Sequence, residues 1–125
     1  MVHNGIEYGL MQMLAEVYDL MKRRLGLTNA QMADEFERWN NGRLQSFLVD
    51  ITVHILRTKD PLGSGDLVDM VSDKARAKGT GKWTSQDAMD LGIPVPTIDA
   101  AVTARELSEY KSQRGEAEKA YPFTG

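Results

Sequence analysis

The chain has 125 residues, a length that fits one ordinary domain. It lacks cysteine, which excludes a disulfide framework and a thiolate site, and its two histidines leave few imidazole ligands, so no metal site is expected. Fifteen basic against eighteen acidic residues give a net charge of −3, so we expect no nucleic-acid partner held by bulk positive charge. No apolar run reaches the roughly 20 residues that span a bilayer. The first residues do not resemble a secretory signal, so we expect a cytoplasmic protein without membrane association.

A long helix is predicted at the N-terminus. From Ile6 to Leu25 the apolar residues recur at helical spacing, and Gly26 supplies a stop. These positions lie on more than one side of the helix, which predicts a surface left over for another helix or another chain. They are Ile6, Leu10, Met13, Leu14, Val17, Leu20, Met21 and Leu25.

Two further helices are predicted before Pro61. Thr28 and Gln31 form a capping box, because the hydroxyl and the amide each satisfy an orphan backbone N–H at a helix start. The helix that they begin is expected to end at Asn40-Asn41-Gly42. Its apolar positions are Met32, Phe36 and Trp39. The stripe of the third helix is Leu44, Phe47, Leu48, Ile51 and Ile55.

The second half of the chain reads as shorter helices between turns. Residues 61–65 form a predicted turn, and a short helix with Leu67, Val68 and Val71 follows. The segment 78–83 shows no helical or strand periodicity of apolar residues.

Thr84 or Ser85 is expected to cap the next short helix, which Gly92 closes. Thr97 begins the last clear helix, and one of its faces carries Ile98, Ala101 and Val102.

The predicted fold class is therefore all-α, a helical bundle with one long N-terminal helix. No alternating run is long enough to predict a strand. We expect residues 1–112 to form the helical domain. Residues 113–125 are expected to form a tail that has few apolar side chains to bury and is prone to disorder.

The start of the long helix is more polar than packing requires. His3, Asn4, Glu7 and Tyr8 share one side of the helix, which runs on into an apolar stripe. This pattern predicts a polar pocket at the edge of a core. The alternative is a solvated first turn with an ordinary His–Glu pair.

The segment Lys78-Gly79-Thr80-Gly81-Lys82-Trp83-Thr84 has the composition of an anion site. Glycines beside a hydroxyl and two lysines allow backbone N–H groups and ammonium groups to converge on a phosphate. It is neither a Walker A loop nor a dinucleotide fingerprint, because the required glycines are missing. The alternative is a flexible charged loop.

Arg105 lies on the apolar stripe of the last clear helix. A guanidinium that faces a core is costly unless it meets an anion, so Arg105 is a candidate to join Lys78 and Thr80 in an oxyanion cradle. The alternatives are an ion pair within the chain or a side chain that reaches the solvent at the rim.

Several segments resemble the decarboxylating 6-phosphogluconate dehydrogenases. The resemblance covers nearly all of the chain, in the family's order, but only part of the enzyme. The segments are Met1-Val2-His3-Asn4-Gly5-Ile6-Glu7-Tyr8, Phe36-Glu37-Arg38-Trp39-Asn40-Asn41-Gly42, Lys78-Gly79-Thr80-Gly81-Lys82-Trp83-Thr84, Leu91-Gly92-Ile93-Pro94-Val95-Pro96 and Ala101-Val102-Thr103-Ala104-Arg105. Residues 73–77 depart from the less charged stretch that the family has before the loop.

The resemblance implies an enzyme that oxidises 6-phosphogluconate with NADP and releases carbon dioxide to give ribulose 5-phosphate. It implies that this chain is the first half of the all-helical domain. Glu7 would then be the general acid, and His3 and Asn4 would hold the sugar acid. Tyr8, Lys78 and Arg105 would hold the phosphate, with a hydroxyl from Thr80.

The resemblance also implies parts that lie outside these residues. In the family a catalytic lysine precedes the segment that begins here at Met1, and a Rossmann domain binds the nucleotide. We therefore expect the chain alone to be inactive, to bind no NADP and to bind 6-phosphogluconate weakly or not at all. The two-sided apolar helix predicts a homodimer. The alternative function is a non-catalytic helical module for dimerisation or scaffolding.

Overall fold

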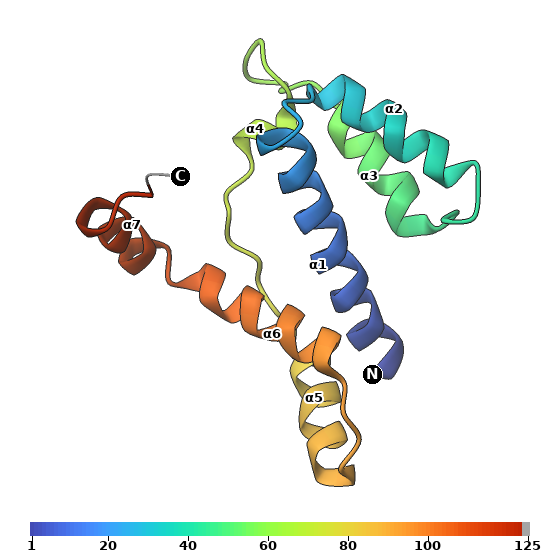
Figure 1. Cartoon of the computed structure of the whole chain (residues 1–125), viewed down its shortest axis with the longest axis vertical. Coiled ribbons are helices and arrows are strands. Elements are labelled where there is room, and N and C mark those ends of the chain that lie inside the picture. The colour runs from blue at the N-terminus through green and yellow to red at the C-terminus, as the bar shows by residue number, and fades with distance from the viewer. Residues whose placement is uncertain (124–125) are drawn as a thin grey trace. The chain divides into compact units, whose positions relative to one another are not determined.

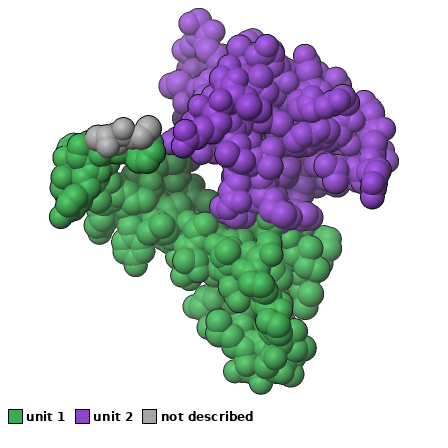
Figure 2. All heavy atoms as spheres, in the orientation of Figure 1, with its two compact units in different colours: residues 1–9, 73–125 green, residues 10–72 purple. Residues whose placement is uncertain are grey.

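The structure is a computed structural model that describes residues 1–123. Within these residues it is helical, as predicted, and its strand-like pairing is limited to an isolated bridge between Lys59 and Asp66. The helices are α1 (Val2–Arg23), α2 (Asn29–Asn40), α3 (Phe47–Arg57), α4 (Leu67–Met70), α5 (Thr80–Leu91), α6 (Pro96–Glu109) and α7 (Lys111–Ala120) (Figure 1). The chain forms two compact units. Unit 1 holds residues 1–9 and the chain from residue 73 on, and unit 2 holds residues 10–72 (Figure 2).

The ends of α1 and α2 follow the local signals of the sequence. Gly26 adopts a φ of +63°, a conformation that glycine enters without strain, and the chain leaves the helix there. The predicted capping box is confirmed: the Thr28 hydroxyl accepts from the backbone N–H of Gln31, and the Gln31 side chain accepts from the backbone N–H of Thr28. Two neighbouring helices are thus separated by a short, well-defined turn.

The core of unit 2 lies where α2 and α3 pack side by side. Phe36 and Met32 are its largest fully buried side chains, and the Phe36 and Trp39 rings meet edge to face at a centroid distance of 5.1 Å. This edge-to-face geometry is favoured by aromatic pairs. The buried residues of the core are Met21, Met32, Ala33, Phe36, Val49, Val53 and Leu56.

The predicted buried face of α3 is wrong. Ser46 caps the helix by accepting from the backbone N–H of Val49, so α3 begins at Phe47 and the turn before it holds Leu44. The side of α3 that faces the core carries Val49, Val53 and Leu56. The expected stripe is instead mostly exposed: Leu44 58%, Phe47 73%, Ile51 38% and Ile55 43%, with Leu48 half-buried. Because α3 is apolar on two sides, its sequence periodicity alone does not select the buried one.

The short helix α4 is tied to α2 by polar contacts within unit 2. The buried Asn29 amide donates to Asp66 and to Asp69, each at 2.8 Å. Lys22 and Lys59 also bind these carboxylates. The bonds from Lys59 and Asn29 lower the pKa of Asp66, and those from Lys22 and Asn29 lower the pKa of Asp69. The predicted turn at residues 61–65 is confirmed, and the Asp60 N–H donates across it to the Gly65 carbonyl.

In unit 1 the start of α5 differs from the prediction. The helix begins at Thr80, after Gly79 with a φ of +105°, and not at Thr84 or Ser85. The Thr84 hydroxyl does not cap a helix. It donates to the carbonyls of Thr80 and Met1, at 2.8 and 3.2 Å. The predicted end at Gly92 is confirmed.

The end of unit 1 is more helical than the sequence indicates. α6 buries Ile98, Ala101 and Val102, as predicted. The segment from residue 113, predicted to pack little, lies mostly within α7, whose residues are not buried. Part of the predicted tail, residues 124 and 125, lies outside the described residues. The domain boundary at residue 112 stays a prediction.

Candidate functional site

Tyr8 is the buried centre of the contact between the first turns of α1 and α5. Its side chain is 7% exposed and lies directly over Gly81, where an added Cβ would come 2.4 Å from the Tyr8 ring. One turn earlier on α1, a Cβ on Gly5 would come 2.7 Å from the Thr84 hydroxyl oxygen. Both distances are too short for a side chain, so the two glycines let these helices approach and hold Tyr8 in place.

Arg105 reaches Tyr8 from α6. Its guanidinium carbon lies 3.8 Å from the centroid of the Tyr8 ring, which is a cation–π contact, and Nη1 donates to the Arg76 carbonyl at 2.9 Å. The side chain is half-buried. The predicted inward orientation is therefore explained within the chain by an aromatic face and a backbone carbonyl.

The loop before α5 combines an unusual backbone with positive charge. The Trp83 ring lies against Gly79, where a Cβ would come 3.0 Å from that ring. No side chain caps α5, and the first N–H groups of a helix have no acceptor within it, so this end attracts anions. Among residues 1–123, the exposed Lys78 ammonium has no hydrogen-bond or ion-pair partner. Thr80, the first residue of α5, is half-buried.

The other polar candidates lie on the first turns of α1. His3 Nε2 lies 3.9 Å from Glu7 Oε1, with side-chain exposures of 82% and 33%. Asn4 is exposed beside them. The predicted shared face is present, but within unit 1 it is open to solvent at His3 and Asn4 rather than enclosed in a pocket.

The structure thus brings some of the predicted site residues into contact and leaves others apart. Tyr8 and Arg105 touch, and His3 and Glu7 form a pair. Lys78 and Thr80 lie in the loop and first turn that lead into Gly81, the residue under the Tyr8 ring. The sequence analysis predicts neither the hydrogen bond from Arg105 to the Arg76 carbonyl nor the packing of Tyr8 on Gly81. Gly81 does belong to the segment predicted as an anion site.

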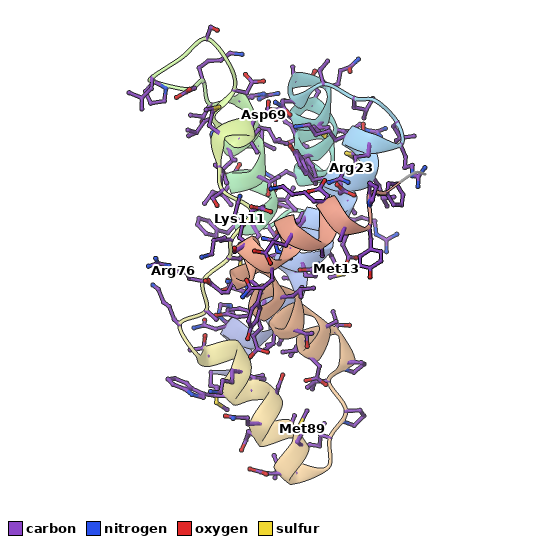
Figure 3. All side chains as sticks on the ribbon, turned by 90° about the vertical axis from the view of Figure 1, so that its left-hand side faces the viewer. Met13, Arg23, Asp69, Arg76, Met89 and Lys111 are labelled. Atoms are coloured by element: carbon purple, nitrogen blue, oxygen red, sulfur yellow. The ribbon has the colours of Figure 1, made fainter. Side chains whose placement is uncertain are left out.

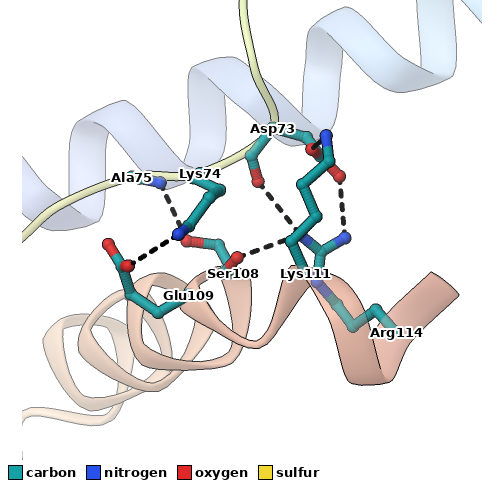
Figure 4. A network of polar contacts seen from close by, with 7 residues as sticks. All are labelled: Asp73, Lys74, Ala75, Ser108, Glu109, Lys111 and Arg114. Atoms are coloured by element: carbon teal, nitrogen blue, oxygen red, sulfur yellow. Dashed lines mark hydrogen bonds and ion pairs between the residues drawn. The ribbon is translucent and has the colours of Figure 1, made fainter. Parts of the chain in front are cut away.

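Residues 73–77 connect α4 to the loop that begins at Lys78. A network of polar contacts holds this connector against α6 and α7 (Figure 4). Asp73 pairs with Lys111 and with Arg114, the latter at 2.7 Å. These two cations hold the pKa of the Asp73 carboxyl well below its usual range. Lys74 pairs with Glu109 at 3.3 Å, and the backbone N–H of Ala75 donates to Ser108 at 2.8 Å. Arg76 projects outward from the same connector (Figure 3).

Two absences hold for the part of the chain that the structure describes. No helix there is long and apolar enough to cross a membrane. No three or more His, Cys, Asp or Glu side chains within residues 1–123 gather in a group that could hold a metal ion.

Comparison with known proteins gives one consistent family. Residues 1–124 match the family model described as 6-phosphogluconate dehydrogenase, C-terminal domain. Over 119 residues the chain is 56% identical to the decarboxylating 6-phosphogluconate dehydrogenase of Lactococcus lactis subsp. cremoris, covering 95% of this chain and 25% of that protein. Over all 125 residues it is 50% identical to a chloroplastic decarboxylating 6-phosphogluconate dehydrogenase of Arabidopsis thaliana, of which it covers 26%.

A solved structure agrees with these relatives. The Plasmodium falciparum 6-phosphogluconate dehydrogenase, studied in its apo form and in complexes with its cofactor NADP+ and its substrate 6-phosphogluconate, superposes with a TM-score of 0.96 at 49% identity. The match covers 98% of this chain and 26% of that one, so the chain spans about a quarter of the length of the relatives that it matches. It therefore belongs to the family of 6-phosphogluconate dehydrogenase C-terminal domains.

Proposed function

We propose that these residues are the part of a decarboxylating 6-phosphogluconate dehydrogenase that carries the general acid and a share of the substrate-phosphate site. The complete enzyme would oxidise 6-phosphogluconate with NADP and release carbon dioxide and ribulose 5-phosphate. Glu7 would deliver the proton that the enediol needs after decarboxylation. The sugar acid would be held by His3 and Asn4, and its phosphate by Tyr8, Lys78, Thr80 and Arg105.

The observation that carries this proposal is the stacking of Arg105 on Tyr8. Two residues from opposite ends of the sequence meet at 3.8 Å, and the Tyr8 ring lies on Gly81 in the first turn of α5. A guanidinium, a phenol and the N-terminal end of a helix are all groups that bind phosphate oxygens. Lys78 adds a second cation that has no partner within residues 1–123. This arrangement supports an anion site rather than a flexible loop.

Residues 1–123 lack the strand–turn–helix pattern of a Rossmann dinucleotide site. A Rossmann site needs a strand, a glycine-rich turn and a helix in succession. Residues 1–123 contain helices and one isolated bridge, and neither Gly79 nor Gly81 follows a strand. We therefore assign no hydride-transfer role to any residue of this chain, and we expect the 125-residue polypeptide alone to be inactive.

Replacing Arg105 by methionine should weaken the binding of 6-phosphogluconate by about tenfold or more, because a charge-assisted hydrogen bond contributes about 1.5–3 kcal/mol. The measurement is an NMR titration of the 125-residue chain, which detects weak ligands. In the unsubstituted chain the backbone signals of Tyr8, Lys78 and Arg105 should shift with 6-phosphogluconate and much less with gluconate, which lacks the phosphate.

Arg43→Met is the matched control, because Arg43 is an exposed arginine in the turn between α2 and α3. It should leave the titration unchanged. Equal shifts with gluconate and 6-phosphogluconate, or an unaltered titration in Arg105→Met, would contradict the proposed phosphate site.

We also propose that the chain associates with a second copy of itself through unit 2. The exposed stripe Phe47, Ile51 and Ile55 on α3 is apolar and has no cover within residues 10–72. Beside the start of α3 lies an apolar groove of about 390 Å³. Its apolar lining residues are Leu10, Met13, Leu14, Val17, Trp39, Leu44, Leu48 and Val49. Exposed apolar surface of this kind favours association.

Sedimentation equilibrium should give the mass of a dimer at high protein concentration. Ile51→Glu places a charge in the centre of the exposed stripe and should shift the chain to a monomer without unfolding it. Asp50→Lys alters a neighbouring exposed residue of the same helix and should not. A monomer mass for the unsubstituted chain at all concentrations would refute the dimer.

A further inference from the structure

The connector at residues 73–77, here called the strap, is held to its unit by polar contacts. Every strap residue is exposed, and none belongs to a helix. Two of its side chains are alanines that offer little apolar surface. An exposed segment without apolar burial is ordered only as well as its hydrogen bonds and ion pairs hold it. The position of the strap therefore depends on the residues that make those bonds.

Ser108 and Arg105 hold two consecutive residues of the strap. The Ser108 hydroxyl accepts from the Ala75 N–H at 2.8 Å and donates to the Arg105 carbonyl at 2.7 Å. The Arg105 guanidinium in turn donates to the Arg76 carbonyl at 2.9 Å. Because Ser108 and Arg105 are three residues apart on α6, these bonds link one helical turn to two backbone groups of the strap, the Ala75 N–H and the Arg76 carbonyl.

The other end of the strap is held by the same part of the chain. Arg114 donates to the Asp73 carboxylate at 2.7 Å and to the Ser108 carbonyl at 2.9 Å (Figure 4). Its guanidinium thus bridges the strap and the end of α6. Lys111 adds a second cation at Asp73. Ser108 is the residue that these contacts share, since it bonds to the strap, to Arg105 and to Arg114.

We propose that Ser108 is a positioning residue for the anion site, which holds the strap so that the Arg76 carbonyl keeps the Arg105 guanidinium over Tyr8. The hydrogen bonds of Ser108 go to Ala75, Arg105 and Arg114. Ser108 acts by fixing the backbone that precedes the loop of Lys78 and the carbonyl to which Arg105 donates. The consequence for ligand binding rests on the proposed function, whereas the effect on Arg105 does not.

The first test uses the chain without ligand. Side-chain protons of Arg105 that lie over an aromatic ring are shielded, so their NMR signals should be displaced upfield in the unsubstituted chain. Ser108→Ala should remove much of this displacement, and Ser108→Thr, which keeps a hydroxyl, should restore it. Ser112→Ala makes the same chemical change at an exposed position of α7 and should leave the signals in place. An unchanged Arg105 signal in Ser108→Ala would overturn the proposal.

Ala75→Pro tests the same bond from the strap, because proline has no N–H to donate to Ser108. This substitution leaves the sequence of α6 unaltered. If circular dichroism shows that Ser108→Ala loses helix, Ala75→Pro still tests whether the bond to the strap positions Arg105. It should move the Arg105 signals in the same direction as Ser108→Ala, and unmoved signals would overturn the proposal.

The second test is the titration with 6-phosphogluconate. Ser108→Ala should weaken binding about fivefold, the effect of one neutral hydrogen bond, and Ser108→Thr should recover it. If the unsubstituted chain gives no phosphate-dependent shifts, the proposal that these residues already form a phosphate site on their own fails. The ligand-free measurement still decides whether Ser108 positions Arg105.

Discussion

Phe36→Ala is expected to lower the free energy of unfolding of unit 2 by about 3–5 kcal/mol, the range for truncating a fully buried phenylalanine. The Phe36 side chain is 0% exposed, and its ring packs on Trp39 at 5.1 Å. Its loss removes apolar contacts and leaves a cavity that the rigid helices α2 and α3 cannot fill. Denaturant unfolding followed by Trp39 fluorescence, in a Trp83→Phe background, measures the change.

Phe47→Ala is the matched control because it makes the same substitution at a side chain that is 73% exposed. At a dilution that keeps the chain monomeric, it should change the stability by no more than about 0.5 kcal/mol. The pair also decides which face of α3 is buried. Equal losses for the two variants would mean that the stripe with Phe47 faces a core, as the sequence alone suggests.

The wrong face of α3 shows where periodicity stops being informative. The existence of the helix, its cap at Ser46 and its end before Pro61 are all local properties, and residues within a few positions determine them. Which of its two apolar sides is buried depends on the face that α2 offers. Phe36 and Met32 fill that face and meet Val49 and its neighbours. This choice is tertiary and is not encoded in the spacing of α3 alone.

The start of α5 differs from the sequence-based prediction for another reason. The sequence rule looks for a hydroxyl cap and finds Thr84, but the Thr84 hydroxyl binds the carbonyls of Thr80 and Met1. The actual start is permitted by the left-handed conformation of Gly79, with the Trp83 ring against it. Glycine adopts positive and negative φ with similar ease, so the sequence alone does not predict a left-handed conformation at Gly79.

The candidate site also has a part that local sequence predicts and a part that depends on tertiary contacts. The inward orientation of Arg105 follows from its place on the apolar stripe of α6. The composition of the segment from Lys78 to Thr84 indicates an anion site. That the Tyr8 ring would lie between Gly81 and the Arg105 guanidinium could not be predicted, because the three residues are distant in the sequence. The charges of the strap are likewise explained only by tertiary contacts, because Arg114 and Lys111 bind Asp73.

Gly81→Ala is expected to destabilise unit 1 by about 2 kcal/mol and to displace Tyr8. The added Cβ would come 2.4 Å from a buried aromatic ring that cannot bend away, and overpacking of this kind costs about 1–3 kcal/mol. Alanine favours a helix interior over glycine by about 1 kcal/mol, but Gly81 lies in the first turn of α5, where this gain is smaller. The clash therefore dominates. Amide hydrogen exchange of α5 and α6 measures the local change in stability.

Gly115→Ala is the matched control in the same unit. Gly115 lies within α7, and nothing lies within 4 Å of an added Cβ there, so the substitution should stabilise the helix by about 0.5–1 kcal/mol. The two variants should thus differ in sign. Only Gly81→Ala should also move the Arg105 signals, because it shifts the ring on which the guanidinium stacks. A Gly81→Ala chain that is as stable as the unsubstituted one, with Arg105 unmoved, would mean that Tyr8 does not lie on Gly81.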